Sequence, residues 1–196
     1  MQNVMPQTLR LGKLLGIALA VLMVSAASSF AHCDTMDGPV VKAAQSALKA
    51  KNVNFVLIWV SKKDESEVKE AFRLALHVRV LNREARQLAD KYFFETVVRL
   101  HRAGEGQPYT GLKPAGTKID PVIRAADKAL DNGSPEELVK FFPENIRAEV
   151  EDRFRNTVSR KKFHPNDVEA GRRYVEAYVS LLEYLERVST GESRLR

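Results

Sequence analysis

PVVKAAQSAL at residues 39–48 and PVIRAADKAL at residues 121–130 are the two stretches of this sequence that decide its fold. They lie 82 residues apart, and further matches at the same offset join Tyr92 to Tyr174 and Leu100 to Leu182. Each stretch opens on a proline, which suits the first turn of a helix because that position needs no N–H. The recurrence predicts two similar helical halves packed about a pseudo-two-fold axis. We expect the recurring tyrosines to pack in the core.

Helical spacing of apolar residues extends outward from both stretches. It predicts helices over residues 66–81, 83–103, 143–160 and 167–189, and the short runs 55–60 and 137–142 are also interpreted as helical. Asp120 and either Asn166 or Asp167 are placed to cap helices, because their short side chains accept hydrogen bonds from free backbone N–H groups. The fold class predicted is therefore all-α, a multi-helix bundle built by internal duplication.

A glycine- and proline-rich stretch separates the two halves. Residues 103–118 read AGEGQPYTGLKPAGTK, and a loop of this length is either functional or a linker, with the linker favoured. The expected organisation is a signal peptide over 1–31, a first helical repeat over 32–103, a linker loop over 104–118 and a second repeat over 119–196.

The first 31 residues have the pattern of a secretory signal. Arg10 and Lys13 precede the apolar run LLGIALAVLMV at 14–24, and small residues follow up to Ala31. The run is shorter than the roughly 20 residues of a membrane span. We expect a periplasmic or secreted protein, cleaved after Ala31, with no stable membrane span afterwards. Cleavage after Ala27 and an uncleaved anchor are the alternatives.

Charge and motif content narrow the classes of function. The formal net charge is +6, but basic and acidic residues are mixed along the chain, so we expect no nucleic-acid partner. The sequence contains no serine-hydrolase elbow, no His-Glu-x-x-His and no Cys-x-x-Cys, which leaves enzymatic activity undecided. Cys33 is the single cysteine and has no partner for an internal disulfide.

Cleavage after Ala31 would place His32 and Cys33 at the mature N-terminus. The α-amine and imidazole of His32 and the amide and thiolate of Cys33 could form a nearly planar nitrogen and sulfur set. Such a set suits Cu(II) or Ni(II), and it binds only after its donors lose their protons. We therefore predict a transition metal ion as partner, with Asp34 and Asp37 as weaker oxygen ligands.

Two further residues are candidates for a place beside the metal. His101 ends a predicted helix, where interaction with the helix C-terminus is the favoured alternative. Tyr109 lies in the loop and could line a site near the N-terminus.

The stretch HCDTMDG at 32–38 resembles the N-terminal hook of nickel-containing superoxide dismutase. That resemblance implies amine and imidazole ligands from His32, amide and thiolate ligands from Cys33, and a helical bundle behind them. The second cysteine of that family falls on Asp37 and its proline on Met36, so the second thiolate, which tunes nickel in that enzyme, is missing.

The mature chain as a whole also resembles a bacterial family of exported proteins of unknown function. The resemblance is carried by HCDTMDGPVVKAA, NVNFVLIWV, YFFETVVRLHRAGEG and PYTGLKP. Three functions stay open: a metal-binding protein that could be redox-active, a non-enzymatic helical interaction module of the cell envelope, and a stress-responsive thiol at Cys33.

Overall fold

The computed structural model describes residues 32–190, and within that range the chain is helical with no β-strand. The all-α, multi-helix fold class predicted from the sequence is confirmed. The predicted signal peptide and its cleavage site after Ala31 lie outside the described residues. Within residues 32–190 there is no helix with the length and apolar character needed to cross a membrane.

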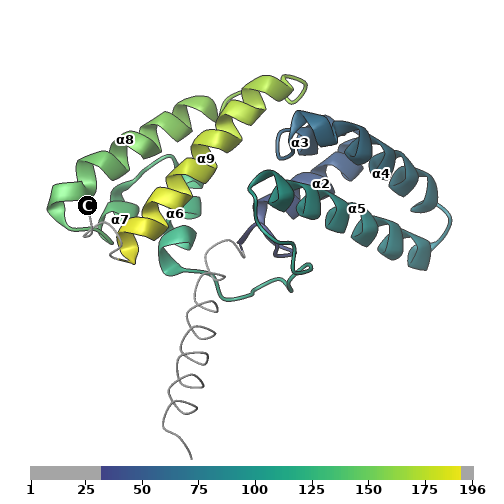
Figure 1. The fold of residues 1–196 in the computed structure, drawn as a ribbon, viewed down its shortest axis with the longest axis horizontal. Helices are drawn as coiled ribbons and strands as arrows, with labels where there is room; N and C mark the ends of the chain where they lie inside the picture. Colours follow the sequence, from purple (N-terminus) through teal and green to yellow (C-terminus); the bar gives the residue numbers. More distant parts are fainter. Residues whose placement is uncertain (1–31, 191–196) are drawn as a thin grey trace, which may run out of the picture.

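The helices form two groups along the chain. In Figure 1, α2 to α5 (purple to teal) gather on one side and α6 to α9 (green to yellow) on the other. The first group consists of α2 (Pro39–Ala50), α3 (Asn54–Leu57), the 3-10 turn η2 (Lys62–Asp64), α4 (Glu65–Val78) and α5 (Arg83–Gly104). The second consists of α6 (Pro121–Asn132), α7 (Glu136–Val139), α8 (Glu144–Arg160) and α9 (Val168–Ser189).

Side-chain caps fix where α6 and α9 begin. Asp120 Oδ1 accepts the N–H of Val122 at 2.8 Å, and Asp167 Oδ1 accepts the N–H of Ala170 at 2.9 Å. Each bond satisfies a backbone donor that the first helical turn leaves free. The predicted caps at Asp120 and Asp167 are confirmed.

The two apolar runs that precede α4 and α8 are only partly helical. The run 55–60 contains the end of α3 and continues as turns, and 137–142 contains the end of α7 followed by turns. The turns redirect the chain toward η2 and toward Pro143, which precedes α8. The expectation that both runs are helical throughout is therefore wrong.

The order of helices repeats between the groups. Helices α2 and α6 have 12 residues each, α3 and α7 have 4 each, and α5 and α9 have 22 each. In both groups the first helix packs on the last, and the last two long helices pack on each other, while α3 contacts α9 across the groups. A common origin of the two halves and a pseudo-two-fold axis stay predictions.

The core lies inside each group and continues across the junction between them. Phe93 of α5 and Leu181 of α9 are fully buried, and Trp59, just after α3, packs edge-on against Tyr178 of α9 with ring centroids 5.9 Å apart. Tyr174 packs against this core, whereas Tyr92 is 47% exposed. The expectation that Tyr92 is a core residue is wrong, because helical spacing alone does not say whether a neighbour covers that face.

Candidate functional site

Residues 32–38 form a turn, called here the N-terminal turn, that the loop after α5 holds in place. The N–H of Met36 donates to the carbonyl of Lys113 at 2.9 Å, and the N–H of Lys113 donates to the carbonyl of Asp34 at 2.9 Å. The carboxylate of Asp37 accepts the N–H of Gly116 at 2.9 Å. The stretch predicted as a linker therefore also fixes the N-terminal turn.

Gly38 closes this turn by close approach of backbone atoms. Its N–H donates to the carbonyl of Thr35 at 2.9 Å, and a Cβ at residue 38 would lie 2.2 Å from the carbonyl oxygen of His32. A contact this short requires the backbone to move, so only glycine fits without a shift. The turn thus has one tightly packed arrangement leading into α2.

The N-terminal turn carries its polar residues into the interior, where they meet residues of α5, α6 and α9. We call this set the junction cluster; its members are His32, Cys33, Asp34, His101, Arg102, Glu105, Asp127 and Tyr178. Burying charged groups costs several kcal/mol each unless they are paired, and clusters of buried titratable groups are concentrated at functional sites. The junction cluster is the candidate functional site for this reason.

Cys33 lies in a negative, buried environment. Burial raises the pKa of its thiol well above the usual value, and the nearby carboxylates of Glu105 and Asp34 raise it further. Reactive cysteines sit in exposed, electropositive surroundings that favour the thiolate. The surroundings of Cys33 therefore argue against the stress-responsive thiol.

Asp34 serves the packing of the cluster. It is buried, and its Oδ1 lies 3.5 Å from Nε of Arg102, whose Nη1 donates to Glu105 Oε2 at 3.2 Å. Burial raises the pKa of Asp34, while the charge of Arg102 acts in the opposite direction. Arg102 thus holds two carboxylates at the end of α5.

His32 is oriented by Asp127 of α6. Its Nε2 lies 2.6 Å from Asp127 Oδ2, and the other carboxylate oxygen, Oδ1, accepts the hydroxyl of Tyr178 at 2.9 Å. Within the described part of the chain, the buried Nδ1 of His32 has no hydrogen-bond partner, and the contact of Nε2 with Asp127 is a close approach and not a well-directed hydrogen bond. One ring nitrogen is therefore held by a carboxylate and the other is left bare.

His101 shows the same arrangement at the end of α5. The ring is 3% exposed, and its Nδ1 donates to the carbonyl of Trp59 at 2.9 Å, since a carbonyl only accepts. Burial lowers the pKa of His101 to about 4, so the ring is neutral at pH 7 and Nε2 carries the lone pair. Among the residues that the structure describes, Nε2 has no hydrogen-bond partner and lies 3.3 Å from Glu105 Oε1.

The ring of His101 does not interact with the C-terminus of its own helix, which was the favoured alternative. The ring reaches across to the segment after α3, and its centroid lies 5.7 Å from that of the Trp59 indole in an edge-on contact.

A cavity of about 20 Å³ lies beside the N-terminal turn. Its lining comprises His32, Cys33 and Glu105 with Val179, Leu182, Glu183 and Glu186 of α9. This volume is enough for one water-sized occupant. Burial raises the pKa of Glu186 to about 7, and the carboxylates of Asp120, Glu183 and Glu105 add to that shift.

The structure brings together only some of the residues that the sequence singles out. His32 and Cys33 line one cavity, whereas Asp37 is exposed and bonded to the loop, and Tyr109 packs half-buried against the core. In residues 32–190 there is no group of three or more His, Cys, Asp or Glu side chains arranged to hold a metal ion.

Sequence reasoning missed several members of the cluster. Arg102 and Glu105 follow His101 by one and four residues, so all three lie at the C-terminal end of α5. This spacing is a signal in the sequence that could have identified them. Asp127 stands where the first repeat has Gln45, and that change of charge at an otherwise repeated position was the other signal.

Comparison with known proteins gives a family without an activity. No curated protein and no solved structure matches the chain. A family model described as a family of unknown function (DUF6448) matches residues 37–184, which includes α2 to α8 and most of α9 and leaves residues 32–36 outside. The likeness of 32–38 to the nickel enzyme's hook stays a prediction. Matched over this length, the chain belongs to the DUF6448 family of unknown function.

Proposed function

We propose that the junction cluster binds a transition metal ion, copper or nickel, in a chain that begins at His32. The main ligands are the α-amine and imidazole of His32 and the amide and thiolate of Cys33. Two of these four donors are backbone nitrogens, so the set does not require three clustered side chains. Nitrogen and sulfur donors in a nearly planar set suit Cu(II) and Ni(II).

One observation carries the proposal: in the largely buried His32 and in the buried His101, one ring nitrogen lies against an oxygen, and the other has no hydrogen-bond partner among the described residues. Asp127 holds His32, and the Trp59 carbonyl holds His101. Histidines that bind metals almost always have this arrangement, because the held nitrogen fixes the orientation of the ring and directs the other nitrogen to the ion. A purely structural histidine would gain from a second hydrogen bond when buried.

The position of the bare nitrogen in His32 suits chelation. With Nε2 turned to Asp127, the free nitrogen is Nδ1, which is the ring nitrogen nearer the backbone of its own residue. Nδ1 and the α-amine of the same histidine can therefore bind one ion together. Asp127 is the positioning residue for this pair.

The electrostatics of the cluster favour a cation. Glu105, Asp34 and Asp127 are the carboxylates that raise the pKa of Cys33, and the same negative field attracts a positive ion. A bound metal ion would outweigh this effect on the thiol, because a coordinating thiol loses its proton. Glu105 lines the cavity and lies against His101, so it is a further donor within reach of both.

In this proposal the two aspartates of the N-terminal turn stabilise the turn and are not metal ligands. Asp34 pairs with Arg102, and Asp37 accepts the Gly116 N–H, so each stabilises the turn that presents His32 and Cys33. The proposal concerns metal binding, which a carrier, a sensor and a redox enzyme would share.

The first test compares two starting residues. A chain that begins at His32 and one that begins at Ser28 have the same side chains at 32 and 33, but only the first has an α-amine at His32. Titration with Cu(II) or Ni(II), followed by calorimetry and by thiolate-to-metal absorption, should give one ion per chain for the first and much weaker binding for the second. If the His32 chain stays metal-free with both ions, the proposal is wrong and the interaction module becomes the better function.

The second test addresses the positioning residue. Asp127→Asn should weaken metal binding by about ten- to a hundredfold, since the partner of a ligating histidine has that order of effect. Asp131→Asn, one turn further along α6 on an exposed residue, is the matched control and should change nothing. Equal affinities in the two variants would show that Asp127 does not orient a ligand.

A further inference from the structure

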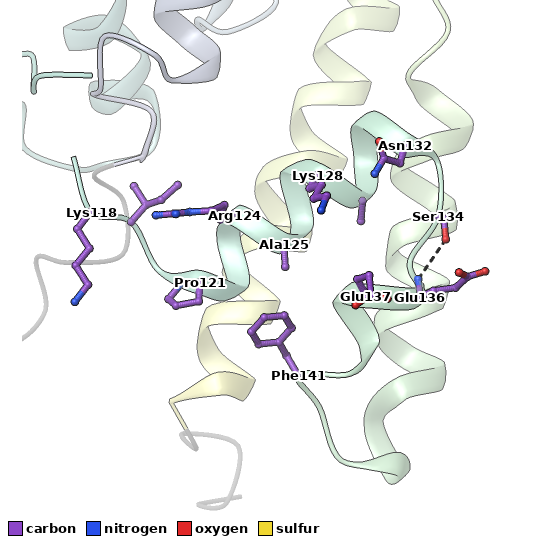
Figure 2. Close-up of a pocket in the computed structure, with 12 residues that line it drawn as sticks. Lys118, Pro121, Arg124, Ala125, Lys128, Asn132, Ser134, Glu136, Glu137 and Phe141 are labelled. Atoms are coloured by element: carbon purple, nitrogen blue, oxygen red, sulfur yellow. Dashed lines mark hydrogen bonds between the residues drawn. The ribbon is translucent and has the colours of Figure 1, made fainter. Parts of the chain in front are cut away.

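An open groove lies between α6 and α7, away from the junction cluster. It has a volume of about 710 Å³, and Phe141, just after α7, is 50% exposed in it. Figure 2 shows the Phe141 ring facing the side of α6 that carries Pro121 and Ala125. Three basic residues, Lys118, Arg124 and Lys128, line the groove on and just before α6, and two acidic ones, Glu136 and Glu137, line it on α7. Within residues 32–190, an apolar floor with a basic wall along α6 is thus left uncovered.

The corresponding groove of the first half is covered. At the offset of 82 residues, Trp59 is the counterpart of Phe141, and Lys42 is the counterpart of Arg124. Phe141 is half exposed, whereas Trp59 is only 8% exposed. Tyr174 and Tyr178 of α9 and Asp127 and Asp131 of α6 cover this groove together with His32 and Asp37 of the N-terminal turn, which leaves about 160 Å³. The chain itself therefore shows what such a groove accepts: tyrosine rings on a helix, with carboxylates facing a basic residue.

The first half carries an unused surface of the same kind. Tyr92 of α5 precedes Tyr174 of α9 by 82 residues, and it is exposed, as is Leu88 one turn earlier at 71%. Glu84 and Glu95 lie on the same face by helical spacing. We call Glu84, Leu88, Tyr92 and Glu95 the α5 stripe; it is an apolar strip between two carboxylates, with Lys91 beside it.

We propose that the α5 stripe of a second copy of this chain occupies the groove between α6 and α7. Leu88 and Tyr92 would cover Phe141, and Glu84 and Glu95 would face the basic wall. Each chain has one groove and one stripe, so two copies can satisfy both contacts at once and close as a dimer. Exposed apolar surfaces that complement each other in charge are a mark of such contacts. The inference is independent of metal binding.

Light scattering after size exclusion tests the association at micromolar concentration. The chain covering residues 32–196 should have twice the mass of one copy, and both Leu88→Asp and Phe141→Asp should be monomeric. Leu74→Asp is the control, because Leu74 is a partly exposed apolar residue of α4 outside the stripe, and this variant should stay dimeric. A parent chain that is monomeric throughout, or a Phe141→Asp variant that stays dimeric, overturns the proposal.

Charge reversal distinguishes a stripe in a groove from a contact between two grooves. Arg124→Glu alone and Glu95→Arg alone should each weaken association by about tenfold, as a like-charge contact does at an interface. An equimolar mixture should regain the parent affinity, because each chain then offers a complement to the other. A mixture that associates no better than its components overturns the pairing. So does a dimer in which Phe141→Asp alone has an effect and Leu88→Asp has none.

Discussion

Helices α5 and α9 have the same length and the same place in their halves, yet their C-terminal ends hold opposite chemistry. The end of α5 buries a neutral histidine, His101, next to Arg102, whereas the end of α9 holds the acid Glu186. Several other charges of the second half, such as Arg155 with Glu151 on α8, form ion pairs at the surface. Equivalent helix ends thus carry different side chains: α5 contributes a buried base and cation to the junction cluster, and α9 contributes an acid to the cavity beside it.

Removing the buried cation of α5 should have the largest effect. In Arg102→Met, Asp34 and Glu105 lose a shared partner in the interior, and we expect the free energy of unfolding to fall by about 3–5 kcal/mol. Urea denaturation followed by circular dichroism measures this loss.

Arg155→Met is the matched variant in the second half. It removes an exposed pair with Glu151, so the expected loss is under about 1 kcal/mol. Equal losses in the two variants would mean that the burial of Arg102 does not set the two halves apart.

His101 should make stability depend on pH. Its pKa is about 4 in the folded chain, against roughly 6.5 for a free histidine, so between these values the unfolded chain binds more protons. The contribution is complete above about pH 6.5 and is lost as the pH falls toward 4, by up to about 3 kcal/mol.

Urea unfolding at a series of pH values measures this dependence. His101→Gln should flatten the curve over that range, whereas His164→Gln, at an exposed position before α9, should leave it as it is. A parent curve that His101→Gln does not change would show that the ring is not held neutral.

The N-terminal turn can be tested through its glycine. Gly38→Ala forces a Cβ against the His32 carbonyl, and overpacking of this kind costs about 2 kcal/mol. Gly104→Ala, at the end of α5, meets no atom within 4 Å and should be neutral or slightly stabilising. Thermal unfolding of both variants gives the comparison. Equal melting temperatures for the two would contradict a tightly packed turn.

The sequence was sufficient for the helices and insufficient for the cluster. Helix positions and the caps at Asp120 and Asp167 depend on neighbours within a few residues, and the pattern contains them. His32 and Cys33 could be singled out from their position after a signal-like segment. Asp127 joins His32 only because α6 packs beside the N-terminal turn, and no local pattern contains that contact.

Tyr92 shows the same limit of the sequence pattern for a residue that was predicted to be buried. It recurs with Tyr174 at one offset, and the sequence pattern is identical whether the face that carries it is covered or open. Only the three-dimensional arrangement distinguishes the two.

The smallest expected effect concerns the acid of α9. The pKa of Glu186 is about 7 in the folded chain and roughly 4.3 in a free glutamate, so its contribution to stability is present at low pH and is lost as the pH rises through 7. This dependence has the opposite sign to that of His101. Glu186→Gln should therefore gain about 1 kcal/mol near pH 8, allowing for solvent screening, and nothing near pH 4.

Glu176→Gln, at an exposed position on α9, is the control for that gain and should show none at either pH. The Glu186 variant also reports on the cavity, because a metal ion bound beside Glu105 and Glu186 favours the ionised carboxylate. In a chain that begins at His32 and is saturated with metal, the gain at high pH should disappear. A gain that persists with metal bound would place the ion away from α9 and confine the proposed site to the end of α5 and the N-terminal turn.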